Sequence, residues 1–183
     1  MSRFVALDLE TTGLDENEDQ ILEIGAAVFD DSFRVEDEFW VVVRPTPVWV
    51  LESMDPVVKE MHTKNGLLEA VRKKGIRRYE AEMELLYFLE RHPETKGTPL
   101  VGNRIDFDKG FLRRHMPQAY CWFHHRNIDV SSLNEFARTW NRAAYDFRPK
   151  STKSHSALLD AKESIAQLAH YAKCWGMPDV SSK

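Results

Sequence analysis

Extended runs of apolar residues open the chain and predict three β-strands. They cover residues 3–10, 20–29 and 35–44, and each run is rich in Val, Ile, Phe or Trp. The connection at 11–19 is polar with one glycine, and the connection at 30–32 is a short polar turn. Short polar connections of this kind favour antiparallel pairing of the strands that they join. The beginning of the chain therefore predicts half of a β-sheet.

Helices and two further strands are predicted in the rest of the chain. Prolines at 45, 47 and 56 interrupt extended structure, and apolar residues then recur at helical spacing. The predicted elements are strands at 98–103 and 124–130 and helices at 64–75, 79–92, 106–116, 131–140 and 158–175. This order predicts an α/β fold in which helices flank a mixed five-stranded sheet.

Length and composition indicate one globular domain. The 183 residues, 43% of them hydrophobic, suit a single core, so we expect residues 1–183 to form one domain. A formal net charge of -4 and a pI near 6.0 exclude a generally basic surface of the kind that grips duplex DNA. Cys121 and Cys174 lack the spacing of a thiolate metal site. No apolar run approaches the roughly 20 residues that span a bilayer, so we expect a cytoplasmic protein without a membrane segment.

A basic run, RKKGIRRYE at residues 72–80, allows two interpretations. It could steer an anionic substrate, or it could be a solvated helix end, which is the more common origin of such a run. We therefore assign no site to it. The five tryptophans are scattered along the chain, and core packing is the interpretation that we favour for most of them.

Two acidic residues, Asp8 and Glu10, interrupt the first strand, FVALDLETTGL. Side chains alternate along a strand, so Val5, Leu7 and Leu9 face one side and the acidic pair faces the other. Adjacent ionised carboxylates repel each other and lose hydration when they are buried, and a divalent cation offsets both costs. The alternative is a strand end whose acidic side chains simply reach water.

Two later helices supply further acidic residues and a histidine. Asp108 falls one turn before Phe111 on the stripe predicted to face the core, although it could instead cap its helix, a role that suits Asp106 better. Asp160 lies near the start of the last helix, in SHSALLDAKES, and His155 stands in the preceding loop. A loop histidine could swing over the helix start toward the same cleft, or it could be an ordinary exposed residue.

Four carboxylates that converge would bind two hard cations. A site of oxygen ligands without thiolate favours Mg²⁺ or Mn²⁺ over zinc. Two such ions, about 3.5 to 4 Å apart, can polarise a phosphodiester, generate hydroxide and stabilise the leaving oxygen, while a nearby histidine takes the proton of the attacking water. The acidic residues and the histidine therefore predict a phosphodiester hydrolase with two divalent cations as cofactors.

Three motifs, DLETTGL, GNRIDFDKGFL and HSALLD, resemble those of 3′-to-5′ exonucleases that carry an Asp-Glu-Asp-Asp quartet and a histidine five residues before the last aspartate. Within that superfamily, MHTKNGL, GNRIDFDKGFLRRHMP, FHHRNIDVSSLNEFARTW and HSALLDAKESIAQLAHY resemble segments of the oligoribonuclease family in the same order. The resemblance runs from about Val5 to Tyr171. It implies a ribonuclease-H-like fold and a single 3′-5′ exonuclease domain over residues 1–183.

The resemblance also implies a mechanism and a substrate. It implies that Asp8, Glu10, Asp108 and Asp160 hold two divalent metal ions and that His155 is the general base. It further implies a homodimer that degrades short single-stranded RNA from the 3′ end and releases 5′-mononucleotides.

Four substrate-binding residues are implied in the same way. Leu14 resembles the leucine that wedges between the last two bases of the substrate. His62, Arg126 and Ser131, with Ser132 as a further candidate, match the polar group that receives the terminal phosphate. A guanidinium suits that task because it offers forked donors to phosphate oxygens and stays charged.

Three positions depart from the oligoribonuclease pattern. Thr11 stands where the family usually has Met, Val57 where it typically has a base-stacking Trp, and His125 where a Tyr reaches across the dimer. Thr11 and the missing Trp favour an alternative, a related 3′-5′ exonuclease that trims single-stranded DNA or longer RNA 3′ ends. A catalytically silent binding module is a second alternative, against which the complete quartet and His155 argue.

Overall fold

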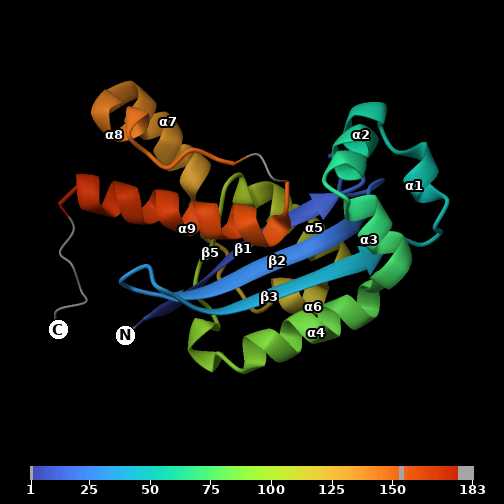
Figure 1. Ribbon diagram of the computed structural model, residues 1–183. Coiled ribbons are helices and arrows are strands. Elements are labelled where there is room, and N and C mark those ends of the chain that lie inside the picture. Colours follow the sequence, from blue (N-terminus) through green and yellow to red (C-terminus); the bar gives the residue numbers. More distant parts are fainter. Residues whose placement is uncertain (1, 153–154, 177–183) are drawn as a thin grey trace.

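A six-stranded mixed β-sheet forms the centre of the molecule in this computed structural model, which describes residues 2–152 and 155–176 (Figure 1). The strands, in the order β4-β3-β2-β1-β5-β6, are β1 (Arg3–Thr11), β2 (Ile21–Asp30), β3 (Val35–Arg44), β4 (Ile76–Arg77), β5 (Leu100–Gly102) and β6 (Asn127–Asp129). β1, β2 and β3 pair antiparallel, whereas β5 lies parallel to β1, β6 to β5 and β4 to β3. The predicted α/β fold with a mixed sheet is therefore confirmed. The strand that the sequence did not predict is the two-residue β4.

Helices cover both faces of the sheet. They are α1 (Val50–Ser53), α2 (Pro56–Lys64), α3 (Leu67–Lys74), α4 (Arg78–Glu90), a 3₁₀ turn η1 (Pro93–Thr95), α5 (Ile105–His115), α6 (Pro117–Tyr120), α7 (Val130–Trp140), α8 (Arg142–Asp146) and α9 (Ala157–Cys174). α9 crosses one face, with α7 and α8 packed against it, while α4, α5 and α6 cover the opposite face (Figure 1). α1 to α3 enclose one end of β2 and β3.

The alternation of side chains along β1 divides the core between these two layers. Val5 and Leu7 are fully buried in the cluster that includes α4, α5 and α6. Ala6 points to the opposite face of the sheet, where it belongs to the same buried cluster as Ala161 of α9. Asp8 continues the row of Ala6, because side chains two residues apart share a face. The acidic side chains of β1 therefore point toward the beginning of α9.

The prolines after β3 have a role that differs from the predicted one. The sequence predicts only an interruption of extended structure there, but Pro56 is the first residue of α2. Asp55 caps this helix by accepting a hydrogen bond from the backbone N–H of Val57 (2.8 Å). Proline is favoured at a first helical position because its missing N–H would have no partner inside the helix. This capped start accounts for a helix that hydrophobic spacing alone did not reveal.

Three of the five tryptophans are exposed rather than buried in the core. Trp122 is buried, whereas Trp40, Trp49 and Trp140 are 40%, 66% and 72% exposed, so core packing was the wrong interpretation for most of them. Over residues 2–152 and 155–176, no helix combines the length and the apolar character that crossing a membrane requires.

Candidate active site

Asp8, Glu10 and Asp108 meet near the carboxyl end of β1. The first two project from the face of β1 that α9 covers, and Asp108 lies in the first turn of α5. Asp108 Oδ1 accepts a hydrogen bond from the backbone N–H of Leu9 (2.9 Å), which holds α5 against β1 at this point. The Asp108 side chain is buried among these elements, and the N-cap position of α5 is Arg104. Asp108 thus faces the interior, as the sequence predicts.

Close packing between α9 and β2 brings Asp160 to the same place. Gly25 lies opposite Asp8 in the register of β1 and β2. A Cβ atom at Gly25 would stand 2.0 Å from the backbone nitrogen of Leu158, so only glycine lets the first turn of α9 lie directly on the sheet. Asp160 belongs to that first turn, and its Oδ1 is buried without a hydrogen-bond partner among the described residues.

Glu23 holds the start of α9, a role that the sequence did not predict. Its Oε2 accepts a hydrogen bond from the backbone N–H of Ala157 (3.0 Å), the first residue of α9, and its Oε1 accepts one from Trp40 Nε1. Glu23 also lies opposite Glu10 in the strand register. A carboxylate at this position stabilises the positive end of the helix and adds a fifth acidic side chain beside the other four. A single acidic residue inside the apolar run ILEIGAAVF is the signal that could have identified it.

His155 stands at the mouth of the site, two residues before α9 begins. Ligand atoms of Glu10, His155 and Asp160 all lie within 4.8 Å of one another. The residue is exposed, its backbone φ is +47°, and its carbonyl oxygen accepts a hydrogen bond from Asn65 Nδ2 (2.6 Å). The loop histidine therefore does lie over the helix start, beside the acidic residues.

Burial raises the pKa values of all four carboxyl groups, and nearby acidic side chains add to the effect. Burial, with the charges of the neighbouring carboxylates, raises the pKa of Asp8 well above its ordinary value and that of Glu10 to about 8. Burial is also the main cause that raises the pKa of Asp108 to about 8 and that of Asp160 to about 6. In the part of the chain that the structure describes, no lysine or arginine forms an ion pair with any of them; the nearest basic group is His62, whose Nε2 lies 3.8 Å from Glu10 Oε2.

This arrangement fits a divalent cation. The charges of the carboxylates are not balanced by basic side chains, and one buried oxygen of Asp160 lacks a donor, so a cation would relieve both the repulsion and the missing contact. Glu10, His155 and Asp160 are close enough to share one ion, and Asp8 and Asp108 line the same cavity. Carboxylate oxygens and an imidazole nitrogen are both ordinary ligands of divalent metals in proteins.

The acidic group forms one wall of a cleft of about 350 Å³. Leu14 and His62, two of the residues predicted to bind substrate, also line this cleft. The Leu14 side chain is 74% exposed, so it is free to contact a ligand. His62 is fully buried, with its Nε2 3.0 Å from the carbonyl oxygen of Thr11, and burial lowers its pKa. The His62 ring therefore forms part of the floor of the cleft.

The other two predicted substrate residues, Arg126 and Ser131, do not line the cleft. Arg126 is exposed immediately before β6. Ser131 Oγ accepts a hydrogen bond from the backbone N–H of Arg104 (2.9 Å) and donates one to Asn103 Oδ1 (3.3 Å), and both of those residues line the cleft. The structure thus places Ser131 behind the cleft wall and Arg126 apart from it.

Arg104 is a residue of the cleft that sequence reasoning missed. Its backbone is left-handed (φ +51°), and its N–H donates to Asp129 Oδ1 and to Ser131 Oγ, both at 2.9 Å. Within the described ranges its guanidinium has no carboxylate partner and packs over the ring of Phe107 at 5.7 Å. A permanent positive charge at the cleft suits an anionic ligand. No motif predicts this role, because the backbone conformation depends on Asp129, which is distant in sequence.

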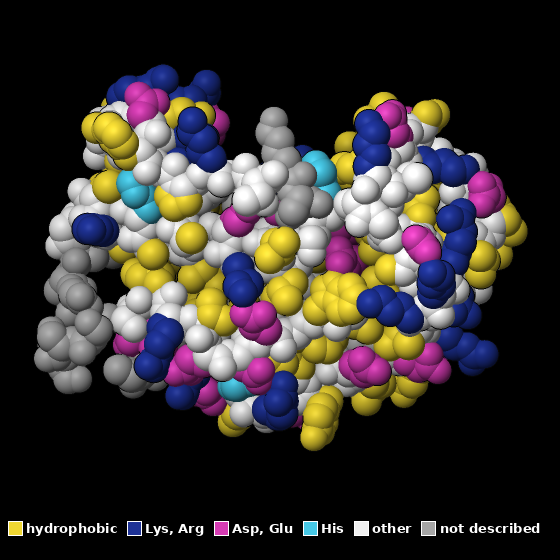
Figure 2. Space-filling model, in the orientation of Figure 1, with side chains coloured by type: hydrophobic (Ala, Val, Ile, Leu, Met, Phe, Trp, Pro, Cys, Tyr) yellow, Lys and Arg dark blue, Asp and Glu magenta, His cyan; other side chains and the backbone are white. Residues whose placement is uncertain are grey.

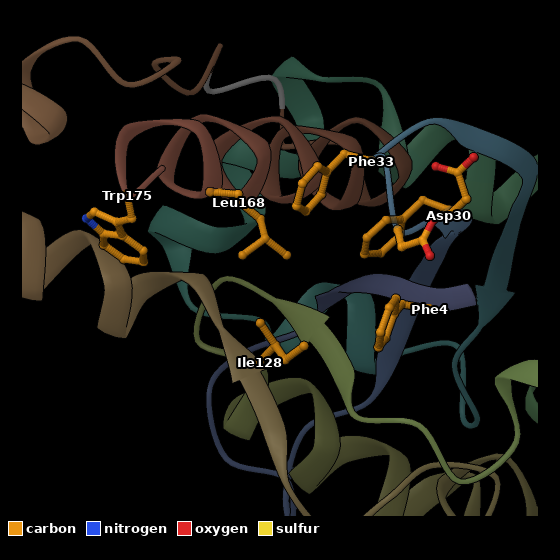
Figure 3. Close-up of a pocket in the computed structure, with 9 residues that line it drawn as sticks. Phe4, Asp30, Phe33, Ile128, Leu168 and Trp175 are labelled. Carbon is orange, nitrogen blue, oxygen red and sulfur yellow. The ribbon is translucent and has the colours of Figure 1, made fainter. Parts of the chain in front are cut away.

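A second cavity, of about 230 Å³, shares no lining residue with the acidic cleft. Figure 3 shows the side chains of Phe4, Phe33, Ile128 and Leu168 around it, with Trp175 at one side. Its lining contains no lysine, arginine or histidine among the described residues. This apolar cavity offers no basic group to a phosphate, so the candidate site is the acidic cleft.

Comparison with known proteins identifies relatives of this chain. The family model described as exonuclease matches residues 5–168. An oligoribonuclease from Aromatoleum aromaticum is 38% identical over 170 residues, which are 93% of this chain and 92% of the relative. The mitochondrial oligoribonuclease of Homo sapiens is 40% identical over 169 residues, which are 92% of this chain and 71% of the relative. Among solved structures, the zinc-bound form of an E. coli exonuclease I complex with single-stranded DNA has a TM-score of 0.73 at 15% identity; the match covers 100% of this chain, which spans only 42% of that one.

Proposed function

Because this chain belongs to the exonuclease family and is a relative of the oligoribonucleases, we propose that it is a metal-dependent 3′-5′ exoribonuclease that degrades short single-stranded RNA to 5′-mononucleotides. The observation that carries the proposal is the convergence of Asp8, Glu10, Asp108, Asp160 and His155 in one cleft. Identity with oligoribonucleases along nearly the whole chain supports RNA, and short strands of it, as the substrate.

The four carboxylates would hold two divalent cations, Mg²⁺ or Mn²⁺. Oxygen ligands without thiolate suit these hard ions, and carboxylates that no basic side chain neutralises supply the negative charge. When bound, such ions polarise a phosphodiester and lower the pKa of a bound water.

His155 would accept the proton of the water that attacks the terminal phosphodiester. Its ring nitrogen lies close to the carboxylates of Glu10 and Asp160, and its side chain is exposed, so a proton taken in the cleft can pass on to solvent. The bond between phosphorus and the 3′ oxygen then breaks, the 3′ oxygen takes a proton, and a 5′-mononucleotide leaves.

The substrate would be held along the cleft by apolar and charged contacts. We assign Leu14 to the bases, because its exposed apolar side chain can insert between them, and Arg104 to the phosphates. His62 forms the floor below the terminal nucleotide. We assign Arg126 and Ser131 to the terminal phosphate, and this assignment rests on the family resemblance alone. Since Arg126 lies apart from this cleft, it would reach substrate bound to a second copy of the chain, in the proposed homodimer.

The proposal places the enzyme in the cytoplasm and treats residues 1–183 as one exonuclease domain. The bacterial relative from Aromatoleum aromaticum is named without reference to an organelle, which agrees with a cytoplasmic location. The relatives from Homo sapiens and Mus musculus are named as mitochondrial.

A related exonuclease that trims single-stranded DNA or longer RNA 3′ ends is the second candidate. The observation that favours it is Val57, which is 75% exposed on α2 where a base-stacking tryptophan is expected. Stacking of a base on an aromatic ring is worth about 1 to 3 kcal/mol, so its loss weakens the grip on a very short strand.

Hydrolysis of a 5′-phosphorylated RNA series from two to about twenty nucleotides, with a matched DNA series, tests the proposal. With Mg²⁺ or Mn²⁺ we expect hydrolysis of RNA that is fastest for the shortest strands. The Asp8→Asn variant, purified in parallel, should be inactive, and this excludes a contaminating nuclease. Comparable rates on DNA or on long RNA would favour the second candidate, and no hydrolysis with either cation would reject both.

A further inference from the structure

A groove outside the catalytic cleft is lined by three arginines. It has a volume of about 790 Å³ and lies between the loop at residues 17–20, the end of β3 and the start of α4. Arg44, Arg77 and Arg78 are exposed along it. Among the described residues, the guanidinium groups of Arg44 and Arg77 form no hydrogen bond or ion pair. Arg78 Nη1 lies 3.3 Å from His115 Nδ1 and likewise has no carboxylate partner there. These side chains come from two separate segments of the sequence, which the fold brings together.

The short strand β4 places two of these arginines side by side. β3 and β4 pair in parallel with Arg44 next to Arg77, and adjacent strands are about 4.8 Å apart. A Cβ atom at Gly75, in the turn before β4, would stand 2.5 Å from the carbonyl oxygen of Val71 and 3.2 Å from the nitrogen of Arg44, so this close approach requires glycine. Like charges on neighbouring strands repel each other. An anionic ligand would offset that repulsion.

Acidic residues also line the groove. They are Glu18 and Asp19, and the carboxylate of Asp19 already accepts hydrogen bonds from Thr12 Oγ1 (2.8 Å) and the backbone N–H of Asp15 (3.0 Å). The arginines therefore form a basic edge of the groove, and the acidic residues come from the loop at residues 17–20. Figure 2 shows further Lys and Arg side chains gathered at this end of the molecule, over α3. A polyanion would bind along the arginine edge.

We propose that this groove binds the phosphodiester backbone of single-stranded RNA, at the 5′ part of strands that are too long for the catalytic cleft. This inference rests on the proposed function and extends it to longer substrates. Tyr79, which is 65% exposed in the first turn of α4, supplies a ring on which a base can stack. A basic edge with an adjacent aromatic ring is the combination that holds single strands without sequence preference.

The length of α5 sets how long a strand must be to use both sites. Asp108 lies near the start of α5 at the cleft, and His115, its last residue, lines the groove. From Asp108 to His115 the helix rises by seven residues, which is about 10 Å at 1.5 Å each. At a rise of about 3.4 Å per stacked nucleotide, this is roughly three nucleotides. A dinucleotide therefore occupies the cleft alone, whereas a twelve-nucleotide strand reaches the groove as well.

Steady-state kinetics of the Arg44→Ala/Arg77→Ala double variant on these two lengths of RNA test the proposal. For a 5′-phosphorylated twelve-nucleotide RNA we expect KM to rise roughly tenfold with kcat unchanged, because phosphate contacts are lost far from the chemistry. Tyr79→Ala should raise the same KM by about tenfold. The kinetics on the dinucleotide should not change in either variant.

The Arg72→Ala/Lys73→Ala double variant is the matched control. It removes the same amount of charge from α3, where Arg72 and Lys73 pair with Glu52 and Glu69 and do not line the groove. We expect its kinetics on both RNAs to equal those of the unchanged protein. If both double variants raise the KM of the long strand equally, only the net charge matters and the proposal is wrong. An unchanged KM in Arg44→Ala/Arg77→Ala would overturn it as well.

Direct binding separates this proposal from the proposed function. Fluorescence anisotropy of a labelled twelve-nucleotide RNA in EDTA reports affinity without hydrolysis. Loss of two phosphate contacts should reduce the slope of log affinity against log salt by about 1.4 in Arg44→Ala/Arg77→Ala. If the chain hydrolyses no RNA but shows this change of slope, the proposed function is wrong and the proposal that the groove binds RNA is supported. If the slope is unchanged while 5′-AMP binding is lost in the variant, the groove holds free mononucleotides and the strand proposal fails.

Discussion

Glu10 and Asp160 are the residues whose ionisation most directly links the site to stability. Their pKa values rise from ordinary values of 4.5 and 3.8 to about 8 and about 6 in the folded chain without metal. Between the ordinary and the raised values, the folded chain therefore holds protons that the unfolded chain has released. Under these conditions the free energy of unfolding falls as pH rises.

The metal-free protein should consequently lose stability between about pH 5 and pH 8 through these two groups. We expect the Tm in EDTA to fall over this range, and Mg²⁺ to raise it most at the alkaline end, where the ligands are easiest to deprotonate. Calorimetry at a series of pH values measures both effects. Glu10→Gln should flatten the pH dependence in EDTA. A slope identical to that of the unchanged protein would show that Glu10 does not titrate in this window.

His155 should be required for the rate rather than for binding. His155→Ala should lower kcat by roughly 10²- to 10⁴-fold with little change in KM, because general base catalysis typically contributes this much. Single-turnover hydrolysis of a dinucleotide measures it. His170→Ala is the matched control, because His170 lies on α9, which follows His155, but contacts the carbonyl oxygen of Ala144 (2.7 Å) instead of the cleft. An unaffected rate in His155→Ala would mean that another group takes the proton.

At the scale of elements, the active site depends on how closely α9 approaches β2. Glu23 binds the first N–H of the helix, and Gly25 leaves room for its backbone. Neither residue touches the proposed substrate. Together they decide where the first turn of α9, and with it Asp160, lies relative to Asp8.

Gly25→Ala should therefore impair catalysis without removing any functional group. The added Cβ would stand 2.0 Å from the backbone nitrogen of Leu158. Because that atom is part of the helix backbone, it can move away only if the start of α9 moves with it. A shift of about 1 Å can cost roughly 100-fold in rate, and overpacking typically costs about 1 to 3 kcal/mol of stability. Activity and thermal unfolding measure the two effects.

Gly110→Ala serves as the comparison for this variant. Its Cβ would meet only the carboxylate of Glu16, the end of a flexible side chain, at 2.2 Å. We expect this variant to keep its activity and its Tm. If Gly25→Ala also keeps both, the distance between α9 and the sheet is not what positions Asp160.

The whole molecule exposes apolar surface that agrees with the proposed homodimer. Phe136 and Trp140 of α7 have ring centroids 5.0 Å apart and lie largely exposed, and Phe147 follows α8 with 83% of its surface exposed. Large exposed apolar patches often mark contact surfaces between proteins.

Size-exclusion chromatography with light scattering should give twice the chain mass of 21.3 kDa. Trp140→Glu should shift the protein toward the monomer, because it places an unpaired charge in the interface of the proposed homodimer. A control at Trp49, which is exposed on a different part of the molecule, should leave the mass unchanged. A monomer at micromolar concentration would contradict the dimer.

Local patterns in the sequence predicted the proposed catalytic residues and most of the sheet. The alternation of Val5, Leu7 and Leu9 with Asp8 and Glu10 is a property of the strand itself, and the spacing of His155 and Asp160 is a property of one short segment. The order of strands and helices followed from hydrophobic period and length. The α/β fold and the family were therefore determined by the sequence alone.

Only the tertiary structure decided features that join distant segments. Glu23 reads as one acidic residue in an apolar strand until β2 meets the start of α9, and Arg104 gains its conformation from Asp129 across two parallel strands. The basic run at residues 72–80 was interpreted from the sequence as a solvated helix end, but β4 pairs with β3 and sets Arg77 of this run beside Arg44. Hydrophobic period specifies which face of an element is buried, but it does not specify which polar groups of separate elements meet. That depends on how the elements pack. It separates the proposed catalytic residues, which local patterns predicted, from the residues that support them and from the arginine groove, which local patterns did not predict.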